Sequence, residues 1–385
     1  MSNMGKTAYK YFVDEGLTIG INLGNFLDAI QNWDVVNNIA NETAWGSPIP
    51  TQKYFNGLKN YGFSILRIPV TWLGHIGPAP DYPINKERLQ RVMEFVNMAN
   101  IAGLKVSINV HHDCNPDYKG WLSLKKAVSS IPDKKIITEM FQKIWLQIAN
   151  YFNECGDWLF FEGFDHVADG NYAYPCIDPD REFDIVNEWN QVFSDTVRST
   201  GGNNQGRYLV FHPYGTRPEQ LISDRFILPQ DPVGGSGKQI ASFQNHEPWL
   251  FSVGISHEWN REGDVIGSMA FYDNIFKSVK ERFINNQIPV IIAQSGPFRY
   301  AYNKKNQWYS EDKVGLAKQN RLEYISYVFG KARENGIVTN YWDIGEYNPE
   351  YATEGDPSLI DRITGEINSD ESAQVIECMM AATKS

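Results

Sequence analysis

The sequence predicts a single α/β domain spanning residues 1–385, a (β/α)8 TIM barrel with its active-site face at the carboxyl ends of the strands. Two observations predict this fold. Short β-branched, apolar runs alternate with amphipathic stretches about eight times, which indicates a parallel sheet that closes on itself. Long polar connections follow several strands, whereas those from helix to strand are short, as at Gly103-Leu104. This asymmetry is typical of a barrel whose loops after the strands build the site.

Eight apolar segments are the expected strands. In chain order they are Thr18–Asn22, Ser64–Ile68, Lys105–Val110, Leu159–Glu162, Tyr208–Phe211, Gln239–Phe243, Pro289–Ala293 and Val338–Trp342. Helices with apolar residues three and four positions apart are expected between most of them. The clearest are Asn85–Ala102, Ile136–Phe152, Phe183–Thr200, Phe271–Asn285 and Asn320–Asn335.

Composition narrows the class of partner. A net charge of -11 argues against nucleic acid and anionic membranes, which require a basic face, and favours a neutral ligand. Aromatic residues make up 14% of the chain, enough for a core and for sugar-stacking surfaces. No apolar run is long enough to span a bilayer, so we expect a soluble protein, and nothing demands more than a monomer. The four cysteines form no C-x-x-C pair and are expected to be free thiols; they are Cys114, Cys155, Cys176 and Cys378.

Polar and aromatic residues gather where the expected strands end. The stretches there are NLGN, RIPVTW, NVHHD, FEGFDH, FHPY, QNH, AQSG and WD. Together with ETAWGSP, WLQIANYF, TVRSTGGNN and LIDRITGE, they resemble glycoside hydrolase family 5, in its endo-β-1,4-glucanase and xyloglucanase branch, over nearly the whole chain. The resemblance implies a β-linked polysaccharide or oligosaccharide as substrate. It also implies a secreted protein whose signal peptide is absent from this sequence.

The resemblance assigns two catalytic positions, and both are altered. A retaining glycosidase needs two carboxyl groups about 5 to 5.5 Å apart, a nucleophile and an acid/base. The family places its acid/base Glu after an Asn at the end of strand four and its nucleophile Glu at the end of strand seven. Here the first pair reads Asp165-His166 and the second position is Gln294. Because an amide is a poor nucleophile, a covalent glycosyl intermediate is not expected at Gln294.

Other positions match the sugar-binding residues that the resemblance implies. Those expected to bind substrate are Asn25, Arg67, His111, His112, Gln244, His246 and Trp342, with Trp72 as a further sugar contact. Two strand ends depart from the family. Its His-x-Tyr on strand six reads Gln244-Asn245-His246, and His212 stands where strand five usually has a small residue or proline.

These changes leave three functions open. The first is a barrel that is inactive or very weak as a glycosidase and binds carbohydrate at most, with no cofactor. The second is a repurposed or engineered hydrolase with a His-rich site. In it His166, His212 and His246 hold a divalent metal such as zinc, or Cys114 acts with a nearby histidine on a small-molecule ester.

The third function is residual endoglucanase activity through another pair of acids. Asp113, Glu247, Asp343 and Glu346 are expected near the same rim. Glu162 is expected roughly 13 Å deeper than His166, at about 3.3 Å per strand residue. Asp165 is expected to face differently from His166, since neighbouring strand side chains alternate. It stays open, with Asp113, as a base that would act with His166 as the acid.

Overall fold

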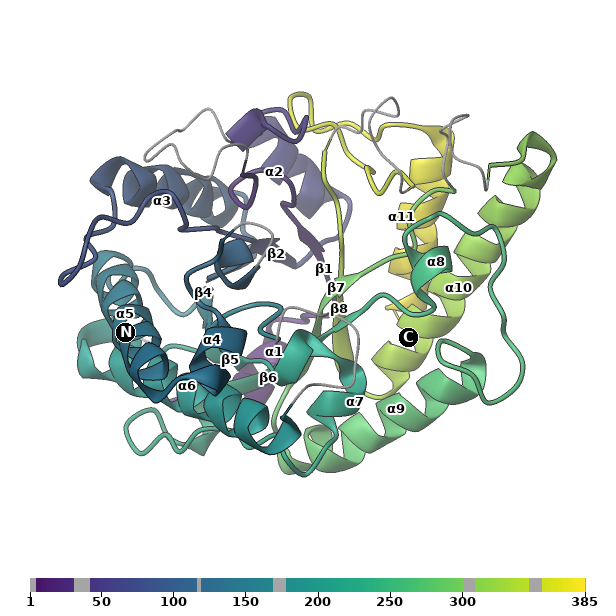
Figure 1. The fold of residues 1–385 in the computed structure, drawn as a ribbon. Helices are drawn as coiled ribbons and strands as arrows, with labels where there is room; N and C mark the ends of the chain where they lie inside the picture. The colour runs from purple at the N-terminus through teal and green to yellow at the C-terminus, as the bar shows by residue number, and fades with distance from the viewer. Residues whose placement is uncertain are drawn as a thin grey trace.

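Eight parallel strands form the closed barrel that the sequence predicts. The computed structural model describes residues 5–30, 42–115, 119–168, 178–300, 309–345 and 355–384. The strands pair in chain order and β8 closes on β1, at the centre of the molecule in Figure 1. They are β1 (Ile19–Asn22), β2 (Ile65–Ile68), β3 (Lys105–Asn109), β4 (Leu159–Glu162), β5 (Leu209–Phe211), β6 (Gln239–Asn245), β7 (Val290–Ser295) and β8 (Ile337–Tyr341).

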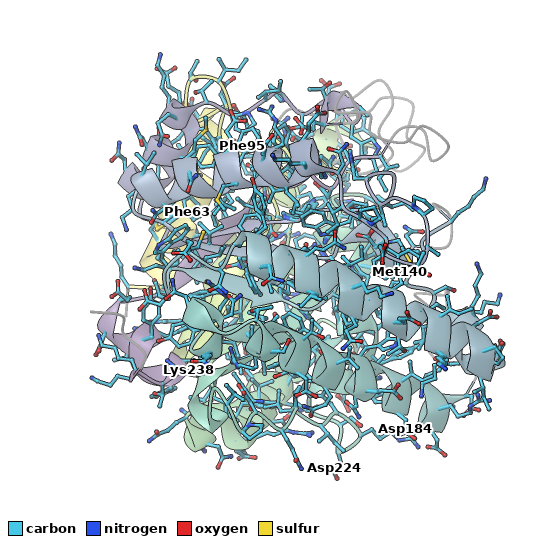
Figure 2. The ribbon with its side chains drawn as sticks, turned by 90° about the vertical axis from the view of Figure 1, so that its left-hand side faces the viewer. Phe63, Phe95, Met140, Asp184, Asp224 and Lys238 are labelled. Atoms are coloured by element: carbon cyan, nitrogen blue, oxygen red, sulfur yellow. The ribbon has the colours of Figure 1, made fainter. Side chains whose placement is uncertain are left out.

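Helices surround the strands. They are α1 (Ala8–Asp14), α2 (Gln52–Asn60), α3 (Lys86–Ile101), α4 (Leu124–Ser129), α5 (Ile131–Tyr151), α6 (Pro179–Ser199), α7 (Pro218–Leu221), α8 (Trp249–Ser252), α9 (Met269–Arg282), α10 (Val314–Glu334) and α11 (Asp370–Ala382). Figure 2 shows α3, α5 and α6 across one side, with Phe95, Met140 and Asp184 labelled on them. Local sequence fixes where these helices begin. Ser130 caps α5 by accepting a hydrogen bond from the amide of Asp133, and Pro132 stands in its first turn.

Aromatic side chains hold β4 against its helices. Trp145 on α5 is fully buried, packs against Phe161 and Phe193, and donates its indole N–H to the carbonyl of Gly163 at 2.9 Å. Gly163 follows β4 directly, so this hydrogen bond fixes the backbone just before Asp165 and His166.

Helix α1 covers the amino ends of the strands. Tyr11 and Phe12 pack against Phe160 on β4, and the ring of Tyr11 lies 4.8 Å from that of Tyr208. These side chains belong to a second apolar cluster, separate from the main core. One end of the barrel is therefore sealed, and the residues that could form a site lie at the other.

The predicted strands agree with the structure to within two residues at each end. The largest differences are in β6 and β7, which run on to Asn245 and Ser295 because their pairing resumes after a register shift. Helices α5 and α10 begin five and six residues before their predicted starts at Ile136 and Asn320. Among the described residues, none of the helices is both long and apolar enough for a bilayer.

Candidate active site

A cavity of about 630 Å³ lies at the carboxyl ends of the strands. Its walls are His111, His112, His166, Ala168, Tyr214, Gly215, Thr216, Arg217, Pro218, Gln244, His246, Glu247, Trp249, Val253, Gln294, Phe298 and Trp342. We call it the cleft. Seven of the residues expected at the site are among them. Six others are not in its walls; they are Asn25, Arg67, Trp72, Cys114, Asp165 and His212.

Two tryptophans give the cleft apolar faces. Trp342 lies nearly parallel to the ring of His111, with 6.1 Å between ring centroids, and Trp249 is 51% exposed. Flat, partly exposed rings of this kind suit the faces of sugar rings. Trp72 does not contribute, because it is fully buried and donates its indole N–H to the carbonyl of Asn109. The expectation that Trp72 binds sugar is therefore wrong.

Both altered positions lie in the wall of the cleft. His166 has a left-handed backbone, with φ of 49°, and burial lowers the pKa of its imidazole to about 3, so the ring is neutral at neutral pH. Its Nδ1 lies 3.4 Å from the hydroxyl of Thr216. The Oε1 of Gln294 lies 3.3 Å from Nε2 of His246.

Asp165 lies beneath the cleft. The prediction that its side chain faces differently from that of His166 is wrong, because both approach the same end of the barrel. Strand β4 ends at Glu162, and the chain beyond it no longer alternates, so the parity argument does not reach Asp165. Its carboxylate is fully buried and lies 3.9 Å from Nε2 of His166. Although burial opposes ionisation, the positive charge of Arg67 and a hydrogen bond from His111 hold the pKa of Asp165 well below its ordinary value.

A charged layer supports Asp165 from below. Arg67 donates to both carboxylate oxygens of Glu162, and Asn109 donates to Glu162 at 2.9 Å. Burial alone would raise the pKa of Glu162, but Arg67 and His212 lower it to about 2. Glu162 is buried below the cleft, as the sequence predicts, and does not reach the substrate side.

The predicted metal triad is not assembled. The described residues hold two groups of three possible ligands, which are Asp28 with His111 and His112, and Glu162 with Asp165 and His212. Neither is the predicted set of His166, His212 and His246. His212 turns down, placing its Nε2 3.0 Å from Glu162, whereas His246 faces Gln294. The second group already contains the guanidinium of Arg67 as its cation.

Cys114 has no access to the cleft. Its thiol is buried and donates to the main-chain carbonyl of Asp165 at 3.0 Å, and burial raises its pKa well above the ordinary value. The nucleophile is the thiolate, so the predicted ester hydrolysis by Cys114 does not fit this environment. Cys176 lies outside the described residues.

We expect a thiol reagent such as dithionitrobenzoate to modify Cys378, which is partly exposed, well before Cys114 in the folded protein. Peptide mapping after timed labelling would measure both rates. Cys114→Ala is expected to leave hydrolysis of any substrate within twofold of the parent. A large loss of hydrolysis would restore Cys114 as a reactive group.

The carboxyl group in the wall of the cleft belongs to Glu247, which the sequence placed among four possible acids. It pairs with Arg217 at 3.1 Å, and Tyr324 donates to its main-chain carbonyl at 2.8 Å. Burial raises the pKa of Glu247 in spite of Arg217. Glu247 could be placed near the site from the sequence because it directly follows the polar end of β6. No sequence pattern places Arg217 there.

The other candidate acids hold the backbone. Asp113 accepts hydrogen bonds from the amide of Trp72 and the indole of Trp121. Asp343 accepts from the amides of Gly345 and Leu359. Glu346 lies outside the described residues.

Comparison with known proteins identifies relatives over most of the chain. The family model for cellulase (glycosyl hydrolase family 5) matches residues 29–348. Endoglucanase A of Paenibacillus barcinonensis is 32% identical over 344 residues, which cover 85% of this chain and 80% of that protein. A xyloglucan-specific endo-β-1,4-glucanase of Bacteroides ovatus is 30% identical, over 90% of this chain and 65% of its own length. The structure of a broad-specificity endoglucanase from Bacteroides salanitronis superposes with a TM-score of 0.85 at 33% identity, covering 99% of this chain and 96% of the other.

These relatives correct the predicted function. The sequence favoured a protein inactive as a glycosidase, limited to carbohydrate binding, or a site repurposed for other substrates. The relatives contradict both, because they are endoglucanases matched over most of this chain. Of the three predicted functions, only the hydrolysis of β-glucan agrees with them. The chain belongs to glycoside hydrolase family 5, in its endoglucanase and xyloglucanase branch.

Proposed function

We propose that this protein hydrolyses internal linkages of a β-1,4-linked glucan such as xyloglucan. We further propose that His166 and Gln294 occupy the family's two glutamate positions, so that other groups carry the reaction. The observation that supports the function is the cleft itself, walled by Trp342 and Trp249 at the open end of the barrel. Related structures hold ligands of this class: a xyloglucan heptasaccharide in the Bacteroides ovatus enzyme, and cellotriose in an endoglucanase from Ruminococcus champanellensis.

The residues of the cleft suggest how the glucan is held. Trp342 stacks on a sugar ring, and polar side chains around it bind hydroxyl groups. We assign that polar role to His111, His112, Gln244 and His246, all in the cleft wall. Arg67 is 1% exposed and acts from below through Glu162 and Asp165. Asn25 is not in the wall, and its predicted role in binding remains a prediction.

Hydrolysis needs a proton for the leaving oxygen and a nucleophile for the anomeric carbon. Glu247 is the proposed proton donor, because burial raises its pKa and favours the protonated carboxyl. Water is the proposed nucleophile, since the amide of Gln294 cannot form a glycosyl ester. The neutral ring of His166 takes the proton of that water, and Asp165, 3.9 Å from Nε2, stabilises the imidazolium as it forms.

The proposed function is tested by incubating the protein with xyloglucan, barley β-glucan and carboxymethyl cellulose. We expect new reducing ends together with a rapid fall in viscosity, which distinguishes internal cleavage from cleavage at chain ends. Trp342→Ala, which removes the stacking surface, should raise KM more than it lowers kcat. The absence of new reducing ends from all three polymers at micromolar protein would overturn the proposed function.

Glu247→Gln is expected to lower kcat about 10²- to 10⁴-fold, the usual contribution of a general acid. The parent's activity should fall as the pH rises through the pKa of Glu247, because the proton donor is lost; the variant should lack this fall. Arg217 and Glu219 are the charged groups that act on Glu247. Glu219→Gln is the matched control, since Glu219 also lies beside Arg217 but outside the cleft wall.

The configuration of the product tests the water attack separately. One displacement by water inverts the anomeric carbon, whereas a covalent intermediate retains its configuration. Proton NMR of the first product formed should therefore show the α-anomer before mutarotation. Initial formation of the β-anomer would rule out direct attack by water.

A further inference from the structure

Asp165 is a buried carboxylate held by donors from four separate elements. Gln244 Nε2 lies 2.7 Å from its Oδ1, and His111 Nδ1 lies 2.9 Å from its Oδ2. Arg67 Nη2 and Gln294 Nε2 approach the same Oδ2 at 3.3 and 3.4 Å. So many donors keep a buried carboxylate ionised. Three of the four, Gln244, His111 and Gln294, also line the cleft, so a single layer of side chains separates this charge from a bound ligand.

The charge of Asp165 is only partly offset by its nearest cation. Arg67 is the one guanidinium in contact with it among the described residues, and Arg67 also forms an ion pair with Glu162. The one charge of Arg67 is therefore shared between two carboxylates, and His212 lies beside Glu162 and not beside Asp165. His111 is neutral at neutral pH, because burial and the neighbouring His112 lower its pKa despite Asp165. The carboxylate of Asp165 thus lies directly beneath Gln294 and His166.

Amide and carboxylate stand in reversed places at positions 165 and 294. The resemblance implies an amide, Asn, at 165 and a carboxylate, Glu, at 294, whereas this chain has Asp165 and Gln294. The two side chains are in contact, Nε2 to Oδ2, at 3.4 Å. Each single change would be unfavourable here. Two carboxylates at this distance repel each other, and two amides leave the site without its net charge. Both changes together preserve the charge and the donor–acceptor contact.

We infer that Asp165 and Gln294 are a compensating pair in which the negative charge needed opposite the anomeric carbon has moved from position 294 to position 165. This inference rests on the proposed function. Glycoside cleavage builds positive charge on the sugar ring, and a fixed anion under the floor of a water-poor cleft stabilises that charge. Asp165 does not touch the sugar, so it is a positioning residue that acts through Gln294, His111 and His166.

A double-mutant cycle tests the pair, using the parent, Asp165→Asn, Gln294→Glu and the double variant. Each protein is measured for its folding equilibrium constant in urea and for kcat and KM on barley β-glucan. Asp165→Asn should lower kcat about 100-fold and change KM less than threefold. Gln294→Glu should lower the folding constant at least tenfold and add an ionisation to the pH profile of kcat, as two carboxylates share one proton. The double variant should recover both quantities to within fivefold of the parent.

Matched variants and separate readouts keep each outcome informative. Asp113→Asn combined with Gln294→Glu is the control, since Asp113 is equally buried but bonded to Trp72 and Trp121, and its effects should multiply independently. If the change in folding constant of the 165/294 double variant equals the product of the two single changes, the two positions do not compensate each other and the inference fails. If folding is coupled but kcat is not, the pair is structural only and the inference fails. If the parent hydrolyses nothing, the proposed function fails, while the folding cycle still decides whether the two positions compensate.

Discussion

Replacing Arg67 by methionine is expected to lower the free energy of unfolding by about 3–5 kcal/mol, the usual loss when one partner of a buried ion pair is removed. Arg67 is 1% exposed and contacts Glu162, Asp165 and Asn22. Methionine fills much of the same volume but leaves two buried carboxylates without their cation. Urea unfolding at neutral pH measures the loss.

The stability lost on replacing Arg67 by methionine should decrease as the pH falls. In the parent, Glu162 has a folded pKa of about 2 against an ordinary value of 4.5, so its ionised form stabilises the fold above pH 4.5, and this contribution fades as the pH falls toward 2. The variant lacks this contribution, so the difference between the two proteins should shrink between pH 4.5 and 2. Arg91→Met is the control, expected to cost at most about 1 kcal/mol, because Arg91 pairs with Glu42 and Glu94 at a partly exposed site. An equal loss at neutral and acidic pH would contradict the assigned role of Arg67.

Conversion of this site to a retaining mechanism is expected to require a change at Asp165 as well as at the two glutamate positions. Restoring both family glutamates, as His166→Glu with Gln294→Glu, is expected to give little gain in kcat while Asp165 remains. Asp165 Oδ2 lies 3.4 Å from Nε2 of Gln294 and 3.9 Å from Nε2 of His166, so three carboxyl groups would crowd together. A proton shared among them would leave the nucleophile largely neutral.

Adding Asp165→Asn should release that nucleophile. We expect the triple variant to exceed the kcat of the double variant at least 100-fold on barley β-glucan, with net retention at the anomeric carbon. A 2-deoxy-2-fluoro glycoside should trap a covalent adduct on residue 294 in the triple variant alone, detectable by intact mass. Equal kcat in the two variants would show that Asp165 does not control the ionisation of residue 294.

Sequence patterns predicted the barrel more securely than the details of its site. Alternating apolar segments and short helix-to-strand connections were enough for the fold, and strand ends located seven residues of the cleft. The direction of Asp165 was mispredicted because alternation holds only inside a strand, and β4 stops at Glu162. His212 was expected at the rim but turns to Glu162, a partner from another strand that no local pattern reveals. Arg217 and Glu247 meet only through folding, since 30 positions separate them.

Because α1 covers one end of the barrel, the aromatic packing that stabilises that end lies far from the cleft at the other end. Tyr11, Phe160 and Tyr208 tie the chain together at the end opposite the cleft. Substitutions that improve the packing of these three rings are expected to raise the temperature at which the protein unfolds without changing the cleft, whereas substitutions around Trp342 change the cleft and leave this packing as it is. Heat tolerance and the proposed glucan selectivity can therefore be optimised in independent libraries and combined afterwards.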